Sequence, residues 1–182
     1  MEVKYRFATL DDAYGIAYVA AHSWKETYSG FMPDEYLDYR INNVNQSVEK
    51  TKKFLENHDT YLVATINDKV VGICYYDKSQ NNDYPDSGLL GALYVLEEYQ
   101  NQGIGKQLFS MAVSNLNKDH NSMYLECLCG NPTLGFYEHF GGKVKEKIDY
   151  PISNFSVKAD IIYYDNLENT NNLLKQKDNK KR

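Results

Sequence analysis

The sequence predicts one α/β domain of the α+β kind, in which helices flank a mixed sheet. The composition is ordinary for a globular protein: 42% of the 182 residues are hydrophobic and 25% are charged. Short β-branched and aromatic runs alternate with amphipathic stretches over residues 2–165. The second half alternates strand, helix and strand, which is typical of crossover connections in a mixed sheet. We expect the domain to cover residues 1–168.

The N-terminal third is predicted as one strand followed by helices. Residues 2–7 alternate apolar and charged side chains, which is the two-residue period of a strand. Thr9 precedes two aspartates, and this pattern starts a helix because it brings a capping oxygen and negative charge to the first turn. A short helix is expected from Asp34, and a polar helix over residues 46–57.

The remaining strands are predicted from apolar runs that end at turns. Residues 61–66 and 69–76 are joined across Asn67-Asp68, which favours a tight hairpin. One helix is expected after residue 103, and another at 132–140, with a proline in its first turn and two glycines after it. Further strands are expected at residues 89–96, 122–128, 144–148 and 157–164.

Charge and composition exclude several classes of protein. The net charge is −5, although the polar tail 169–182, which we expect to be disordered, is basic. The acidic remainder does not suit nucleic acid and would attract a cationic amine. No run approaches the roughly 18 apolar residues of a membrane span, and the N-terminus lacks a signal-peptide pattern, so no membrane partner is predicted.

The three cysteines indicate a reducing cytoplasm, because their number is odd and their spacing fits no disulfide framework. Cys127 and Cys129 have no second pair of Cys or His at ligand spacing, so no metal site is predicted. A homodimer is compatible with the sequence but is not specified by it.

Residues 94–106 place a strand, a polar turn, two glycines and a helix start in succession. A helix N-terminus exposes unpaired backbone N–H groups and a partial positive charge. Gly103 and Gly105 let a bulky anion approach those groups, and Lys106 adds charge. The segment therefore predicts an anion site that suits a diphosphate.

Two familiar nucleotide loops are excluded by spacing. A dinucleotide fingerprint needs a third glycine, where Leu108 stands. A Walker loop needs glycine at Gln100 and Ser or Thr at Gln107. The pattern Gln100-x-x-Gly103-x-Gly105 remains, and its plain alternative is a tight turn that only starts a helix.

This pattern, placed after an apolar strand, resembles the signature of the GNAT superfamily of acyl-CoA-dependent N-acetyltransferases. Downstream, Asn131-Pro132 followed by the Phe-Tyr-Glu-His-Phe-Gly-Gly run of residues 136–142 resembles that superfamily's second motif. The resemblance implies a GNAT fold: a central mixed, mostly antiparallel sheet of six to seven strands. That sheet would be splayed at the acyl-CoA site and flanked by about four helices.

The resemblance also implies a site for acetyl-CoA as co-substrate, without a metal. Backbone N–H groups from Gln102 to Lys106 would hold the pyrophosphate, and Asn131 would reach the pantetheine chain. Tyr137 would lie near the thioester sulfur. The full set of residues expected to bind acetyl-CoA is Leu93, Tyr94, Val95, Gln100, Gln102, Gly103, Ile104, Gly105, Lys106, Asn131 and Tyr137.

Acetyl transfer to an amine requires a base for the ammonium, donors for the oxyanion and an acid for the leaving thiolate. Tyr137 suits the last task, because a phenol has a pKa of about 10. Many GNAT enzymes carry a glutamate on the strand before the turn, but residues 88–93 contain none.

Glu126 is the other candidate base. Leu125-Glu126-Cys127 resembles the Leu-Glu-Val segment of ribosomal-protein alanine acetyltransferases, in which that glutamate is the base. The step from Asn131 to Tyr137 is one residue shorter here than in that group. Two alternatives stay open: Glu126 faces solvent or a pairing partner, and a chain of waters with Tyr or His groups removes the proton.

Trp24 and Tyr28 are the candidate residues for binding the acceptor. An aromatic wall in an acidic protein suits a small cationic amine such as a polyamine, whereas inward packing of the two rings is the structural alternative. A protein amino group, at an N-terminus or a lysine, is the second acceptor class. A non-catalytic acyl-CoA-binding sensor is the competing function.

Overall fold

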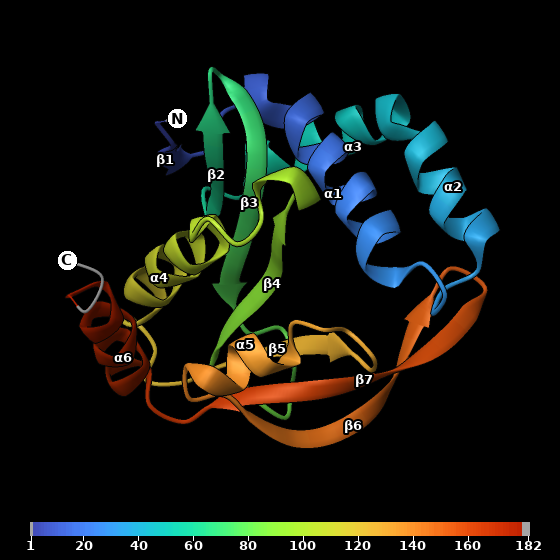
Figure 1. Ribbon diagram of the computed structural model, residues 1–182. Helices are drawn as coiled ribbons and strands as arrows, with labels where there is room; N and C mark the ends of the chain where they lie inside the picture. The colour runs from blue at the N-terminus through green and yellow to red at the C-terminus, as the bar shows by residue number, and fades with distance from the viewer. Residues whose placement is uncertain (1, 180–182) are drawn as a thin grey trace. The chain divides into compact units, whose positions relative to one another are not determined.

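A computed structural model describes residues 2–179 (Figure 1). The chain divides into two compact units. The first unit comprises the residues up to Tyr75 together with Ala92–Phe109, and the second comprises Tyr76–Gly91 and the residues from Ser110 onward.

Seven strands form the sheet, as the sequence predicts. Their hydrogen-bonded order is β1-β2-β3-β4-β5-β7-β6. The pairs β1–β2, β2–β3, β5–β7 and β6–β7 are antiparallel, and β4–β5 is parallel, so the predicted mixed and mostly antiparallel sheet is confirmed. The strands are β1 Lys4–Phe7, β2 Tyr61–Ile66, β3 Lys69–Lys78, β4 Gly88–Val95, β5 Met123–Leu128, β6 Lys143–Ile152 and β7 Phe155–Tyr164.

Six α-helices and two short 3₁₀ helices accompany the sheet in the described part of the chain, against the roughly four helices expected. The predicted proline in the first turn of the fifth helix is wrong, because that helix begins two residues after Pro132. The helices are η1 Leu10–Asp12, α1 Ala13–Tyr28, α2 Asp34–Asn42, α3 Val44–Asn57, η2 Glu97–Tyr99, α4 Ile104–Leu116, α5 Leu134–His139 and α6 Leu167–Asn179.

Helix α6 corrects the prediction that the tail from residue 169 is disordered. Leu167 and Leu174 are fully buried, and Thr170 and Asn171 between them are buried as well. These four positions share one helix face. The face is not evident in the sequence because its two central members are polar. Residues 180–182 lie outside the described residues, and the predicted domain limit at residue 168 stays a prediction.

A β-bulge at Val71 shapes the first unit. Ala64 of β2 pairs with Gly72, but the next residue pairs with Val70, so Val71 is an extra residue in β3. The bulge turns Val70 and Ile73 toward α1, where they join one apolar cluster. Gly72 instead faces α4: a Cβ added to it would lie 3.2 Å from Ile104 Cγ2 and 3.2 Å from Leu108 Cδ1. Helices α1 and α4 therefore cover opposite faces of β3 (Figure 1).

The β2–β3 hairpin confirms the predicted turn. Asn67 and Asp68 have φ values of 49° and 62°, the left-handed conformation that a tight two-residue hairpin requires and that Asn and Asp tolerate.

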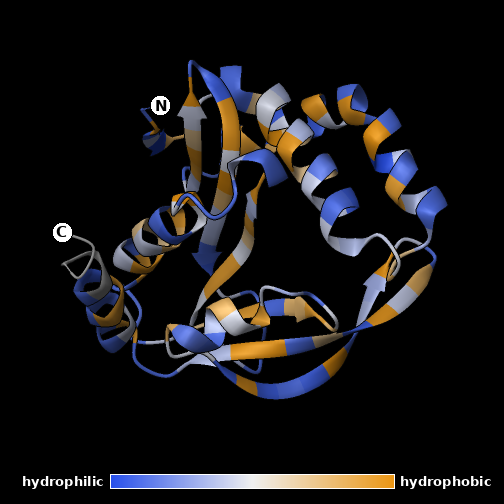
Figure 2. Ribbon diagram, in the orientation of Figure 1, coloured by the Kyte–Doolittle hydropathy of each residue, from blue (hydrophilic) through white to orange (hydrophobic). Residues whose placement is uncertain are grey.

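The second unit is built on β5, β7 and β6. Strand β6 lies at the sheet edge, is exposed along most of its length and carries mainly hydrophilic residues (Figure 2). Charged edge strands resist pairing with other chains. At the start of β4, the register with β5 covers only Gly88 with Met123 and Leu89 with Tyr124.

Asp12 fixes the start of α1. Its carboxylate accepts two hydrogen bonds from Arg6, at 2.6 and 2.8 Å, and one from the backbone N–H of Thr9 at 2.8 Å. Burial alone would raise the pKa of Asp12, but these hydrogen bonds hold it below its ordinary value. The predicted helix start at Thr9 and its two aspartates is confirmed.

We expect Asp12→Asn to lower the free energy of unfolding by about 1–2 kcal/mol near pH 7. Because the native pKa is lowered, the carboxylate stabilises the fold above its unfolded pKa and ceases to do so as the pH falls through the native value. The difference between variant and wild type should therefore shrink in urea titrations at progressively lower pH. The exposed neighbour supplies the control: Asp11→Asn should change little, and an equal loss there would contradict this assignment.

Candidate active site

The turn between β4 and α4 is held by the side chains of its own glutamines. Gln100 Nε2 donates to the carbonyl oxygen of Val95, the last residue of β4, at 2.9 Å. Gln102 Nε2 donates to the carbonyl oxygen of Glu98 at 3.3 Å. Both side chains therefore constrain the path of the loop through hydrogen bonds within the protein.

The backbone of this turn presents the start of α4. Asn101 and Gly103 are both left-handed, with φ values of 58° and 84°. The first bond of the helical ladder runs from Gln107 N–H to the Gly103 carbonyl oxygen at 3.0 Å, so the amides of Ile104 and Gly105 precede it and have no acceptor within the helix. A Cβ placed on Gly103 would meet nothing within 4 Å. The arrangement is a strand–turn–helix with an open approach to helix-start amides, which suits an anion.

Gly105 has a packing role beside that opening. A Cβ on it would lie 3.6 Å from Val95 Cγ2, an ordinary contact distance. The first turn of α4 therefore rests directly on the end of β4. Lys106, the next residue, is half-buried and has interactions of its own.

Glu26 connects α1 to the same turn. Its Oε2 accepts the backbone N–H of Glu97 at 3.2 Å, at the start of η2. Burial, together with the nearby charges of Glu97 and Glu98, raises the pKa of Glu26. No local pattern predicts this contact, because 71 residues separate the two partners.

Trp24 and Tyr28 pack together, as the structural alternative predicted. Their ring centroids are 4.9 Å apart, and Tyr28 is buried. Trp24 Nε1 donates to Tyr94 Oη at 2.9 Å, which ties α1 to β4. The guanidinium of Arg40, in the last turn of α2, lies 4.3 Å from the centre of the Trp24 ring. Arg40 was not predicted as a site residue, because it lies on another helix and belongs to no motif.

Tyr137 lies in α5 of the second unit and is buried. Its backbone carbonyl accepts hydrogen bonds from Tyr164 Oη at 2.9 Å and from the N–H groups of Gly142 and Phe140 at 3.0 and 3.2 Å. Gly142 is required for this arrangement, since a Cβ there would lie 2.7 Å from Ile162 Cγ2. The helix that carries the phenol is thus anchored to β7.

Asn131 starts the segment that leads into α5. Its side-chain Oδ1 accepts the N–H of Thr133 at 2.9 Å and the Thr133 hydroxyl at 2.7 Å. These bonds are an Asx turn, which orients the side chain before the helix begins at Leu134.

Glu126 lies on β5 opposite Ile161 of β7. Its side chain is exposed, whereas both sequence neighbours in the strand are buried. Partial burial of the carboxylate by the surrounding protein nevertheless raises its pKa. A carboxylate with a raised pKa is a stronger proton acceptor.

Two of the three cysteines, Cys74 and Cys127, are poor nucleophiles because they are buried. Burial, with a contribution from the charge of Asp160, raises the pKa of Cys127 to about 11, so that thiol is protonated near neutral pH. Cys74 is fully buried, and burial raises the pKa of its thiol too. Cys129 Sγ accepts a hydrogen bond from Lys147 Nζ at 2.9 Å.

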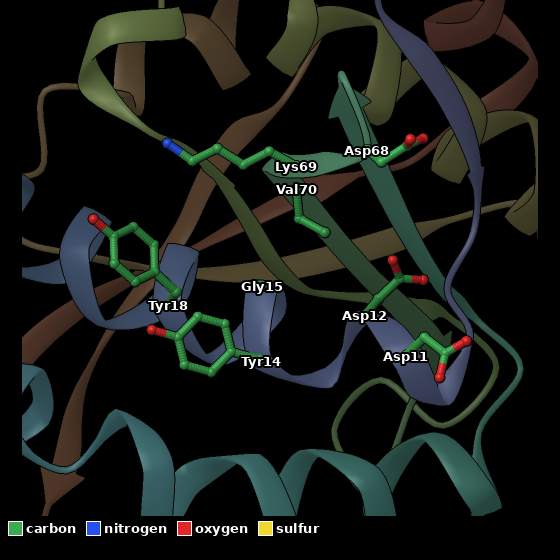
Figure 3. Close-up of a pocket in the computed structure, with 8 residues that line it drawn as sticks. All are labelled: Asp11, Asp12, Tyr14, Gly15, Tyr18, Asp68, Lys69 and Val70. Atoms are coloured by element: carbon green, nitrogen blue, oxygen red, sulfur yellow. The ribbon is translucent and has the colours of Figure 1, made fainter.

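A hollow of about 420 Å³ lies in the first unit, and none of the residues that line it is a predicted site residue (Figure 3). Tyr14 and Tyr18 of α1 stand next to each other on one side of it, and the side chains of Asp68 and Lys69 point in opposite directions. Its charged groups are largely engaged elsewhere: Asp12 with Arg6, and Lys69 with Glu98 at 3.5 Å. We assign it no function.

Comparison with known proteins gives concordant results. The family described as "Acetyltransferase (GNAT) domain" matches residues 57–141, which include the turn, Glu126, Asn131 and Tyr137. The uncharacterised N-acetyltransferase YuaI of Bacillus subtilis is 27% identical over 158 residues, covering 86% of this chain and 89% of that protein. Residues 57–141 of this chain thus match a GNAT acetyltransferase domain, as the sequence motifs predicted.

Solved GNAT structures share the fold. The PaiA N-acetyltransferase of Thermoplasma acidophilum, in complex with coenzyme A, has a TM-score of 0.69 and 22% identity, covering 90% of this chain and 98% of that one. A GCN5-related N-acetyltransferase of Rhodopseudomonas palustris has a TM-score of 0.72 and 14% identity, covering 90% and 95%. These structures show the fold, and together with the family match and the Bacillus subtilis relative they bear out the predicted GNAT acyltransferase.

The GNAT match separates two groups of site residues. The turn and the second motif as far as Gly141 fall inside residues 57–141, whereas Trp24, Tyr28 and Arg40 precede them. In the described part of the chain, no helix has both the length and the apolar character needed to cross a membrane.

Proposed function

We propose that this GNAT protein transfers an acetyl group from acetyl-CoA to a primary amine by direct attack. The observation that carries the proposal is the strand–turn–helix at residues 95–107, in which left-handed Gly103 opens the helix-start amides to a diphosphate. The coenzyme A bound to the fold relative from Thermoplasma acidophilum supports the same class of ligand. A cytoplasmic location and a homodimer stay predictions.

In this proposal, the amides from Gln102 to Lys106 bind the pyrophosphate and the backbone of residues 93–95 binds the pantetheine arm. The register of β4 with β5 ends at Leu89, so the later backbone groups of β4 are not part of that pairing. Asn131 is assigned to the pantetheine chain.

The reaction has three proton-transfer and charge requirements. A base takes a proton from the ammonium, and the neutral amine then attacks the thioester carbonyl. A backbone N–H of residues 93–95 donates to the oxyanion of the tetrahedral intermediate. The intermediate collapses by breaking the C–S bond, and Tyr137 gives its phenolic proton to the departing thiolate. The amide nitrogen then loses its second proton, which restores the Tyr137 phenol. Buried, protonated Cys127 favours this direct route over an acyl-cysteine intermediate.

Glu126 is the proposed base. Its exposed position gives access to solvent and substrate protons, and its raised pKa makes it a better acceptor than an ordinary carboxylate. A chain of waters with Tyr or His groups is the alternative.

The acceptor is proposed to be a small amine. The sequence predicted an aromatic wall at Trp24 and Tyr28 for a cationic amine, but the Arg40 guanidinium lies over the Trp24 ring. A panel of polyamines, amino acids and peptides, incubated with acetyl-CoA and analysed by mass spectrometry, tests the proposed function. Thiol release that no amine accelerates would instead support an acyl-CoA-binding module.

We expect Gly103→Asn to fold but to bind acetyl-CoA at least about tenfold more weakly in calorimetry. Asparagine tolerates a left-handed backbone, and the space beside Gly103 is open, so the new side chain would obstruct the amides without unfolding the turn. Asn101→Gly, two residues earlier, is the matched control and should bind normally. Unchanged affinity in Gly103→Asn would place the pyrophosphate elsewhere.

We expect Tyr137→Phe to keep its affinity for acetyl-CoA and to lose about 10²–10⁴-fold in kcat, because the thiolate would leave without an acid. The matched control is Tyr163→Phe on β7, which should retain wild-type turnover. Near-normal kcat in Tyr137→Phe would remove the phenol from the mechanism.

We expect Glu126→Gln to lower kcat about 10²-fold. In the wild type, kcat should rise with pH as the carboxylate forms, with a midpoint above the ordinary value for glutamate, because its pKa is raised. The variant should lose this limb of the pH profile. Glu138→Gln, on the exposed face of α5, serves as the control, and an unchanged profile in Glu126→Gln would favour the water chain.

A further inference from the structure

Arg40 is half-buried, and its guanidinium makes few of the hydrogen bonds that it could donate. A guanidinium has five N–H donors. Its Nη1 donates to Tyr36 Oη at 3.3 Å, at the long end of the range for a hydrogen bond. Its Nε is buried and has no hydrogen-bond partner among the described residues.

No carboxylate of the described residues forms an ion pair with Arg40. The nearest acid in the sequence, Asp38, pairs with Lys25 at 2.5 Å. Buried polar atoms are nearly always satisfied, so an orphaned donor on a charged group indicates a missing partner. For a planar fork of N–H donors, the matching partner is a carboxylate bound by two parallel hydrogen bonds.

Aromatic rings hold this guanidinium in place. It lies 4.3 Å from the centre of the Trp24 ring and 5.9 Å from that of Tyr36. Trp24 and Tyr36 are themselves in edge contact, with centroids 6.2 Å apart. A guanidinium positioned in advance loses less side-chain entropy when it binds a ligand.

The same group of contacts continues to β4. Trp24 Nε1 donates to Tyr94 Oη, and Tyr94 lies in β4 within residues 93–95, whose backbone is proposed to bind the pantetheine arm. Arg40, Trp24 and Tyr94 therefore form one continuous group within the first unit, from α2 to β4.

We propose that Arg40 binds a carboxylate of the acceptor, so that the acceptor is a small molecule carrying both an amine and a carboxylate. This inference rests on the proposed acetyl transfer and narrows its substrate class. A polyamine fits poorly here, because a second cation would meet the positive charge of Arg40 and would find the Trp24 face covered.

Matched substrates test the proposal directly. Ornithine and putrescine, like lysine and cadaverine, differ by one carboxylate and share the same terminal amine. We expect kcat/KM for the amino acid of each pair to exceed that for the diamine by about 10- to 100-fold, the range for hydrogen bonds between charged groups. Equal rates, or faster acetylation of the diamines, would overturn the proposal while leaving acetyl transfer to amines intact.

Two substitutions separate recognition from packing. Arg40→Met keeps an unbranched side chain over Trp24 and removes the charge, so the preference for the amino acid should disappear while kcat/KM for the diamine stays unchanged or rises. Arg40→Lys retains the charge without the planar fork and should keep only part of the preference. Circular dichroism checks that both variants fold, and an undiminished preference in Arg40→Met would refute the assignment.

Trp24 also provides a readout that needs no turnover, because it is the only tryptophan of the chain. Titration with glutarate, a dicarboxylate without an amine, should change the tryptophan fluorescence of the wild type and should not change that of Arg40→Met. If no amine is acetylated but this signal appears, the proposed function fails and the carboxylate site stands. If glutarate produces no signal and the paired substrates react equally, the carboxylate site fails.

Discussion

The start of α4 is the constraint on which the rest of the site depends. The chain must leave β4, reverse direction and enter a helix, and it does so through two left-handed residues, Asn101 and Gly103. The reversal leaves the first amides of α4 outside the helical ladder. Asparagine can adopt the left-handed conformation at position 101. At position 103, glycine adopts it too, and its lack of a side chain keeps the approach to those amides open. Backbone geometry and anion binding are therefore satisfied by the same glycine.

Hydrogen bonds from polar side chains stabilise the turn between β4 and α4, in addition to apolar packing. Gln100 and Gln102 bond to carbonyl oxygens of the segment that they follow, and Glu26 bonds to the N–H of Glu97 from a separate helix. The loop is thus defined before any ligand arrives, which lowers the conformational cost of binding. Helix α5 shows the same principle in the second unit, where the Tyr137 carbonyl is held by three donors.

The sequence was sufficient for the parts of the fold that follow a local period or motif. Most strands, the β2–β3 hairpin and the strand–turn–helix at Gly103 were predicted near their observed limits, because each depends on neighbouring residues. Strand β6 is the exception, since it continues to Ile152 whereas the prediction ended at residue 148. Helix α6 was missed because the polar residues Thr170 and Asn171 interrupt its apolar face. Burial of a polar face depends on tertiary contacts that no local pattern encodes.

Long-range side-chain contacts were the other part that the sequence did not reveal. Arg40 lies 16 positions after Trp24, and only the packing of α2 against α1 brings the guanidinium over the ring. The raised pKa of Glu126 likewise depends on the residues that surround it in space. Motifs select residues whose roles repeat across a family, whereas residues that distinguish one substrate from another stand outside those motifs.

The extra residue in β3 has a mechanical consequence. Val70 and Ile73 support α1, Gly72 between them receives α4, and the carbonyl oxygen of Val71 accepts the N–H of Leu96 at 3.0 Å. Residues 70–73 thus contact α1, which holds Trp24, and α4, which begins at the anion turn. They also bond to Leu96, directly after β4. A shift of either helix would therefore change its contacts with this short stretch of backbone. This segment contributes no side chain to the chemistry, yet deleting its extra residue would reverse the faces of the strand that carry the two helices.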